Sequence, residues 1–194
     1  MRVQGRDQHQ RALQIVFQAF GVGLQALHTV LGKAVHGVAQ HAAEDDVLAV
    51  EVRRGRERFG NTRLFSRRET AKPLLRAIKE GDVFFNLPDM DFGLKDSAFV
   101  PFFGVPACTL LTPSRMARLL GMTVQPVIAE MLPGSQGYRV RFLEPWTDFP
   151  TDDPLADTAA LNRWLEAEIR RNPAQYLWVH RRFKTRPSGE PRFY

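Results

Sequence analysis

Between residues 72 and 173, short apolar runs that suit strands alternate with amphipathic runs that suit helices, and Pro or Gly marks nearly every boundary. Residues 72–81 predict a helix with a Pro in its first turn and a Gly at its end, and residues 112–121 predict a second helix of the same form. Residues 154–172 place Leu, Trp and Ile side chains at helical spacing, so a third helix is expected there, with Asp157 facing water.

The strands are expected between these helices. Residues 82–87 read as a short buried strand, and residues 97–104 as an apolar segment whose Pro101 argues against a central position in a sheet. Residues 122–132 and 138–145 read as two strands joined by a hairpin-like loop. Alternation of strands with helices predicts an α/β domain, in which helices flank a layered mixed sheet.

Two composition features limit the possible partners and sites. The formal net charge of +6 and the pI near 10.0 favour an anionic partner, which is nucleic acid, a phospholipid surface or a phosphorylated substrate. Cys108 is the only cysteine, so neither an intramolecular disulfide nor a multi-cysteine zinc site can form, and the thiol is expected to be a small buried residue. The sequence shows no confident membrane span, because charged and polar residues interrupt its best candidate at residues 12–35.

Four segments of the chain carry a family resemblance: "GRERFGN", "GDVFFNLPDMDFG", "FVPFFGVPA" and "PAQYLWVHRRFKTRP". Together they resemble the late acyltransferases of lipid A biosynthesis, which include lauroyl and myristoyl transferases, from about Arg53 to Tyr194. The resemblance implies the glycerolipid acyltransferase fold. It also implies transfer of a fatty acyl group from an acyl carrier protein or coenzyme A thioester to a hydroxyl of a lipid A precursor in lipopolysaccharide biosynthesis. The expected location is the cytoplasmic face of the Gram-negative inner membrane, and no metal or redox cofactor is expected.

The family pairs a His with an Asp or Glu five positions later, and this pattern bears on residues 1–52. His41 and Asp46 have that separation, but no apolar strand is evident before His41, and the distance to Arg56 is short for the family. We therefore expect two regions: an atypical segment at 1–52, from a misplaced start, a frameshift or a degraded gene, and the carboxy-terminal portion of an acyltransferase domain at 53–194. Whether His41 and Asp46 form the pair stays open.

Three residues are candidates for the chemistry. Asp89 and Asp91 follow the predicted strand at 82–87, where α/β proteins commonly place sites, and the resemblance gives Asp89 a catalytic or organising role. A turn stabilised by Asp side chains is the structural alternative. Arg56 matches the Gly-Arg block of the family and is expected to hold a phosphate or an oxyanion, with a solvated helix face as its alternative.

The carboxy-terminal basic segment is the candidate for binding phosphate. Its cations lie beside Tyr176 and Trp178, as at the rim of a membrane interface, and are expected to contact substrate or lipid phosphates on an anionic membrane surface: Arg181, Arg182 and Lys184. His180 is expected to be a packed or hydrogen-bonded residue rather than a base.

Two alternatives to an active acyltransferase remain at this point. The first is a catalytically inactive fragment of the family that still binds anionic lipid. The second is a basic nucleic-acid-binding domain in which residues 53–68 follow the phosphates. This second alternative lacks a recognition helix and an aromatic sheet signature, so no nucleic acid partner is expected.

Overall fold

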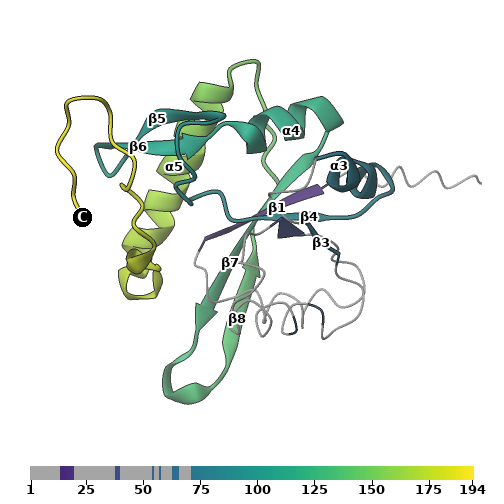
Figure 1. Ribbon diagram of the computed structural model, residues 1–194. Coiled ribbons are helices and arrows are strands. Elements are labelled where there is room, and N and C mark those ends of the chain that lie inside the picture. The colour runs from purple at the N-terminus through teal and green to yellow at the C-terminus, as the bar shows by residue number, and fades with distance from the viewer. Residues whose placement is uncertain (1–13, 20–37, 40–53, 55–56, 58–62, 66–70) are drawn as a thin grey trace, which may run out of the picture.

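The computed structural model describes residues 14–19, 38–39, 54, 57, 63–65 and 71–194. A six-stranded sheet with the strand order β3-β2-β4-β1-β7-β8 lies in the middle of the fold (Figure 1). Its strands are β1 (Gln14–Ala19), β2 (Val38–Ala39), β3 (Leu64–Phe65), β4 (Phe84–Asn86), β7 (Thr123–Met131) and β8 (Tyr138–Phe142). The first five strands in that order are parallel to one another, and β8 is antiparallel to β7. The expected α/β class with a mixed sheet is confirmed.

Strand β1 occupies a central place that the sequence pattern did not indicate. It lies between β4 and β7, with Ile15 opposite Phe84 on one side and Val124 on the other. The sequence indicates no strand within the atypical segment at 1–52, but residues 14–19 form β1. The local signals were weak because parallel neighbours are distant in sequence, so no hairpin turn marks such a strand. Strand β2 likewise ends two residues before His41, where no strand was expected.

Strands β5 (Ser97–Phe102) and β6 (Val105–Leu110) form a separate two-stranded antiparallel hairpin. Pro101 of β5 lies opposite Pro106 of β6. Proline has no N–H to donate, so this strand pair suits the edge of a sheet and not its centre. The prediction that Pro101 excludes a central strand is confirmed.

The three expected helices are present as α3 (Lys72–Lys79), α4 (Thr112–Leu120) and α5 (Pro154–Arg171). Each has a Pro in its first turn, where the missing N–H costs no helical hydrogen bond. Helix α4 ends at Gly121, whose φ of 61° is left-handed, and Asp153 caps α5 by accepting from the N–H of Leu155 at 2.8 Å. Short 3₁₀ turns lie between β7 and β8, as η3 (Pro133–Ser135), and after α5, as η4 (Pro173–Gln175) and η5 (Trp178–His180). Within the described ranges, no helix is long and apolar enough to span a bilayer.

The main core lies between the sheet and all three helices. Alternate residues of a strand point to opposite faces, so Phe84 joins this core while Phe85 packs on the other face with Val127. Helix α5 contributes the stripe that its spacing predicted, and the hairpin adds Phe102. The buried core residues are Ile78, Phe84, Phe102, Ala107, Ala117, Met122, Val124, Ile128, Phe149, Leu161, Leu165, Ile169 and Tyr176.

Asp157 corrects one expectation about α5. It was expected to face water, but it is buried and accepts hydrogen bonds from the hydroxyl of Ser114 at 2.5 Å and the N–H of Thr151 at 3.0 Å. Its position in the first turn of α5 is electrostatically favourable for a carboxylate. The amino-terminal end of α5 packs against α4. Asp157, which helical spacing places on the outer side of α5, is therefore enclosed.

Candidate functional site

The loop that follows β4 carries both candidate aspartates. Because β1, β4 and β7 are parallel, their carboxyl ends lie at one edge of the sheet, and the loop leaves β4 at that edge. Asp89 and Asp91 are both buried. The tertiary fold brings the basic carboxy-terminal segment to the same loop, so the residues of the two predicted sites are neighbours.

Asp91 joins the loop to the carboxy-terminal segment. One carboxylate oxygen accepts from the N–H of Gly93 at 3.0 Å and the hydroxyl of Thr185 at 2.9 Å. The other accepts from the N–H of Thr185 at 2.7 Å. Lys184 donates through Nζ to the backbone carbonyl of Asp91 at 3.0 Å. Both carboxylate oxygens of Asp91 therefore accept hydrogen bonds from the protein. The bond from Gly93, two residues later, forms the Asp-stabilised turn that was the structural alternative for this residue.

Asp89 lies near the buried phenol of Tyr176. Burial is the main cause that raises the pKa of Tyr176, and the negative charge of Asp89 and a hydrogen bond with it raise this pKa further. The hydroxyl of Tyr176 also lies 3.3 Å from Nε2 of His180, whose Nδ1 contacts the carbonyl of Leu177. Tyr176 thus stays a neutral donor that can hydrogen-bond the carboxylate, while His180 is hydrogen-bonded in the way that the sequence predicted.

Arg182 is the cation enclosed within this group. Only 2% of its surface is exposed, and it donates to the carbonyl of Cys108 at 2.9 Å and the hydroxyl of Thr109 at 2.6 Å. Burial lowers the pKa of Arg182, and the nearby charges of Asp89 and Asp91 raise it. The expected contact with a lipid phosphate does not fit this position, because the guanidinium points into the protein.

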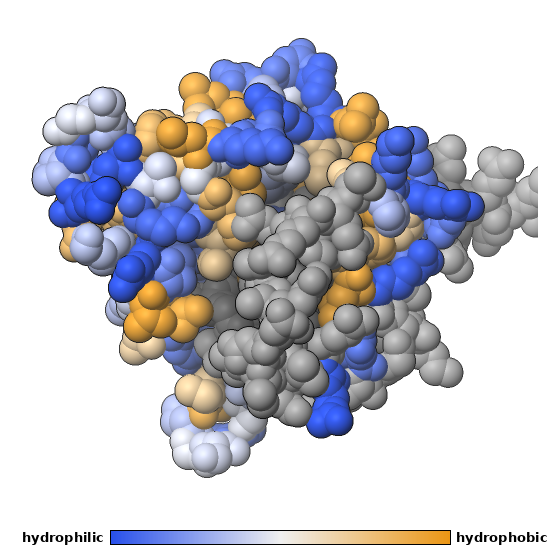
Figure 2. Space-filling model, viewed as in Figure 1, coloured by the Kyte–Doolittle hydropathy of each residue, from blue (hydrophilic) through white to orange (hydrophobic). Residues whose placement is uncertain are grey.

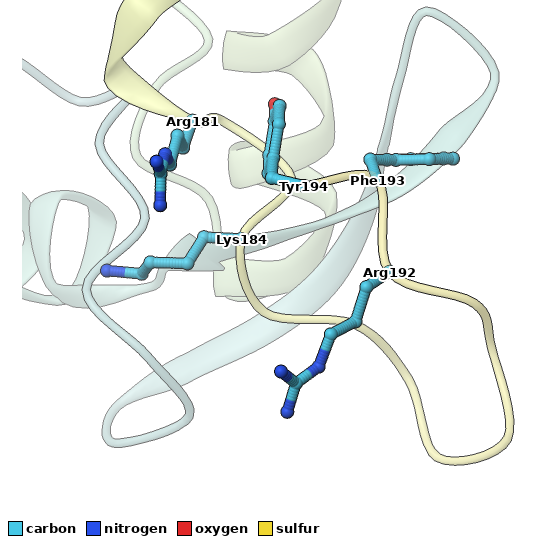
Figure 3. Close-up of a pocket in the computed structure, with 5 residues that line it drawn as sticks. All are labelled: Arg181, Lys184, Arg192, Phe193 and Tyr194. Atoms are coloured by element: carbon cyan, nitrogen blue, oxygen red, sulfur yellow. The ribbon is translucent and has the colours of Figure 1, made fainter.

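Arg181 and Lys184, by contrast, are exposed and line a surface pocket. The pocket has a volume of about 300 Å³, and its other lining residues are Arg192, Phe193 and Tyr194. Figure 3 shows both cationic side chains extending from the carboxy-terminal segment, with the Tyr194 ring beside Arg181. None of the five lining residues is acidic. Three cationic side chains in a lining that has no acidic side chain suit an anion such as a phosphate group.

The aromatic residues next to these cations divide into two groups. Trp178 is about half exposed, as expected at the rim of an interface. Tyr176 is buried, so the expectation that it lies at that rim is wrong. The cause is packing with the hairpin: the Tyr176 ring lies 6.3 Å from that of Phe102.

Three residues of the sequence hypothesis cannot be placed. Arg56, His41 and Asp46 lie outside the described residues. In the described part of the chain, no three His, Cys, Asp or Glu side chains gather as a metal site.

The Cys108 thiol is expected to react slowly in the folded protein. Burial, followed by the charge of Asp91, raises the pKa of Cys108, and the thiol donates to the carbonyl of Gly93 at 3.2 Å. A raised pKa reduces the thiolate fraction at any given pH, and thiolate is the form that alkylates. At pH 8, iodoacetamide should label the native chain at least about tenfold more slowly than the chain in 6 M guanidinium, as measured by mass spectrometry. Equal rates would show that the thiol is accessible.

Sequence reasoning missed the polar residues that hold the cluster together. Thr185 clamps Asp91, and Asn162 of α5 donates to the carbonyl of Pro101 at 3.0 Å and lies 3.4 Å from Arg182. The only available signal was a polar Asn within the apolar stripe of a helix. No local signal paired Thr185 with Asp91, because they lie 94 positions apart.

Comparison with known proteins places the chain in a family. The family model for bacterial lipid A biosynthesis acyltransferases matches residues 5–185, a range that extends upstream of residue 53. The lipid A biosynthesis lauroyltransferase of Escherichia coli (strain K12) is 38% identical over 128 residues, which cover 66% of this chain and 42% of that protein. The palmitoleoyltransferase of the same organism is 34% identical over 198 residues, covering 99% of this chain and 64% of that protein. The chain therefore spans less than two thirds of the length of either relative, and it belongs to the bacterial lipid A biosynthesis acyltransferase family.

Proposed function

We propose that this chain takes part in transferring a fatty acyl group from an acyl carrier protein or coenzyme A thioester to a hydroxyl of a lipid A precursor. The observation that carries the proposal is the buried Asp89 at the carboxyl edge of the sheet, on a loop that Asp91 and Thr185 connect to a cationic surface pocket. Family membership supports the reaction class. We further propose the glycerolipid acyltransferase fold and a location at the cytoplasmic face of the inner membrane.

The reaction assigns a distinct task to each group. A base removes the proton of the acceptor hydroxyl, its oxygen attacks the thioester carbonyl, and the thiolate leaves with a proton. No electron is transferred, so the balance needs no redox cofactor. His41 with Asp46 remains the candidate pair for the base, and Arg56 remains the candidate for stabilising the oxyanion or holding a phosphate.

Asp89 and Arg182 are proposed as positioning residues. The charge of Asp89 lies beside Tyr176 and supports a cation that forms during proton transfer. Arg182 partly compensates the buried charges of Asp89 and Asp91, so the loop keeps one arrangement. Asp91, first expected to be catalytic, is proposed to fix the carboxy-terminal segment against that loop.

Arg181 and Lys184 are proposed to hold a phosphate of the acceptor. Charge-assisted hydrogen bonds to phosphate are among the strong ones, although exposure to water weakens them here. The double variant Arg181→Ala with Lys184→Ala should raise KM for a phosphorylated acceptor about tenfold and change kcat little. An assay with a radiolabelled acyl donor and a range of acceptor concentrations measures both constants.

The matched control removes two exposed lysines from α3, Lys72→Ala with Lys79→Ala, and changes net charge equally. It should leave KM unchanged. An equal rise in KM in both double variants would show a general charge effect and contradict the phosphate contact. Absence of transfer from both donors in the unmodified chain would contradict the proposed reaction itself.

A further inference from the structure

An exposed apolar turn follows α5. Leu177, Trp178 and Val179 are consecutive in sequence, and 48%, 51% and 81% of their surfaces are exposed. Trp178 and Val179 belong to the short 3₁₀ turn η5 at the foot of α5, and Leu177 directly precedes it. Figure 2 shows apolar surface in this region, bordered by hydrophilic residues. Single exposed apolar residues are common, but three in a row at one turn need an explanation.

The tip of the β7–β8 hairpin extends this apolar surface. Met131 and Tyr138 lie opposite each other at the end of the hairpin, and 50% and 40% of their surfaces are exposed. Gln175 binds this tip to the foot of α5: its Oε1 accepts from the N–H of Met131 at 2.8 Å, and its Nε2 donates to the carbonyl of Met131 at 2.9 Å. Gln175 thus holds the hairpin tip next to the apolar turn, and we call the exposed apolar residues of both together the foot surface: Met131, Tyr138, Leu177, Trp178 and Val179.

Internal contacts hold the aromatic residue of the foot surface in place. The indole N–H of Trp178 donates to the carbonyl of Pro173 at 2.9 Å. Its ring lies 4.8 Å from that of Tyr176 and 6.2 Å from that of Phe103. The ring is thus fixed before any partner binds, which reduces the entropy lost on binding.

Cations border the foot surface on one side. Arg181 follows η5 directly and lines the cationic pocket with Lys184 and Arg192. Among the described residues, none of these three cations forms an ion pair with an acidic side chain, whereas Arg170 pairs with Glu166. Each cation near an anionic membrane contributes about 1 kcal/mol of attraction.

We infer that the foot surface docks the protein on an anionic lipid bilayer. A surface with exposed Trp and Tyr side chains and cations beside it matches the layering of a bilayer, where rings lie at headgroup depth and cations meet lipid phosphates. This inference deepens the proposed function and rests on it for one point. The foot surface lies at the edge of the sheet that carries Asp89, and the proposed function places the acyl transfer at that edge. Tyr176, which contacts Asp89 electrostatically, precedes the turn by one residue. An acceptor that stays anchored by its acyl chains would then reach the site from the bilayer.

Vesicle binding tests the inference. The full chain is mixed with vesicles of phosphatidylcholine alone or with a third of phosphatidylglycerol, and the bound fraction is measured by sedimentation. The unmodified chain should bind the anionic vesicles more tightly, and Val179→Asp should weaken that binding about tenfold, because a charge enters the apolar layer. Arg181→Glu should weaken binding to the anionic vesicles and leave binding to neutral vesicles unchanged.

Leu119→Asp is the matched control, since Leu119 is an apolar residue of α4 with 74% of its surface exposed and lies outside the foot surface. It should bind vesicles like the unmodified chain, and thermal unfolding should confirm that all variants fold. Equal binding by Val179→Asp and the unmodified chain, an equal loss in Leu119→Asp, or no vesicle binding at all would overturn the inference.

Binding is measured without acyl donor or acceptor, so a chain that transfers no acyl group still tests this surface. A chain that transfers acyl groups in detergent but ignores vesicles contradicts only the docking.

Discussion

Replacing Asp89 by Asn should lower kcat/KM for acyl transfer by about 10²- to 10⁴-fold, the range that general acid-base groups contribute. Asn keeps the size of the side chain and removes the negative charge that lies beside Tyr176. In the proposed reaction that charge supports a cation that forms on the base, so its loss should act on kcat more than on KM. Initial rates with a labelled thioester donor, measured across pH, give both constants and show whether the pH profile shifts.

Asp91→Asn is the matched control for this measurement. Both oxygens of Asp91 accept hydrogen bonds from protein groups, so the amide places an NH₂ group against an N–H or hydroxyl donor. This variant should lose about 1–3 kcal/mol of stability. At a temperature where it stays folded, it should keep kcat/KM within about tenfold of the unmodified chain. Wild-type kcat in Asp89→Asn, or an equal loss in both variants, would contradict the positioning role of Asp89.

The largest expected change in stability comes from Arg182→Met, which should reduce the free energy of unfolding by about 3–5 kcal/mol. Met fills much of the volume, but the carbonyl of Cys108 and the hydroxyl of Thr109 lose their donor. Asp89 and Asp91 also lose a nearby positive charge within a buried region. Urea unfolding followed by fluorescence measures the loss, and an unchanged m-value would show that only stability has changed.

Arg181→Met provides a comparison one residue away. Arg181 has a left-handed backbone with φ of 54°, and Met keeps the same backbone demand, so the variant differs only in side chain. Its side chain is exposed, and the free energy of unfolding should change by no more than about 0.5 kcal/mol. Equal losses in the two variants would contradict the assignment of Arg182 as the buried cation.

Helices were predictable here because their signals are local. The Pro and Gly residues that bound α3 and α4 act through backbone geometry within one turn, and the apolar stripe of α5 follows from its own spacing. Strand β1 was missed because its place between β4 and β7 depends on neighbours far along the chain. The solvent exposure expected for Asp157 was wrong for a similar reason, since α4 and Thr151 enclose it.

The sequence alone determined the α/β class, the three helices, the edge position that Pro101 requires, and the loop that places Asp89 after a buried strand. Only the tertiary structure decided which of two adjacent arginines is buried. Arg181 and Arg182 share the same local sequence, yet one lines a surface pocket and the other lies under the β5–β6 hairpin. The physical reason is that the cost of burying a charge is offset by acceptors and carboxylates from distant segments, and their positions are fixed only when the sheet, the hairpin and α5 pack together.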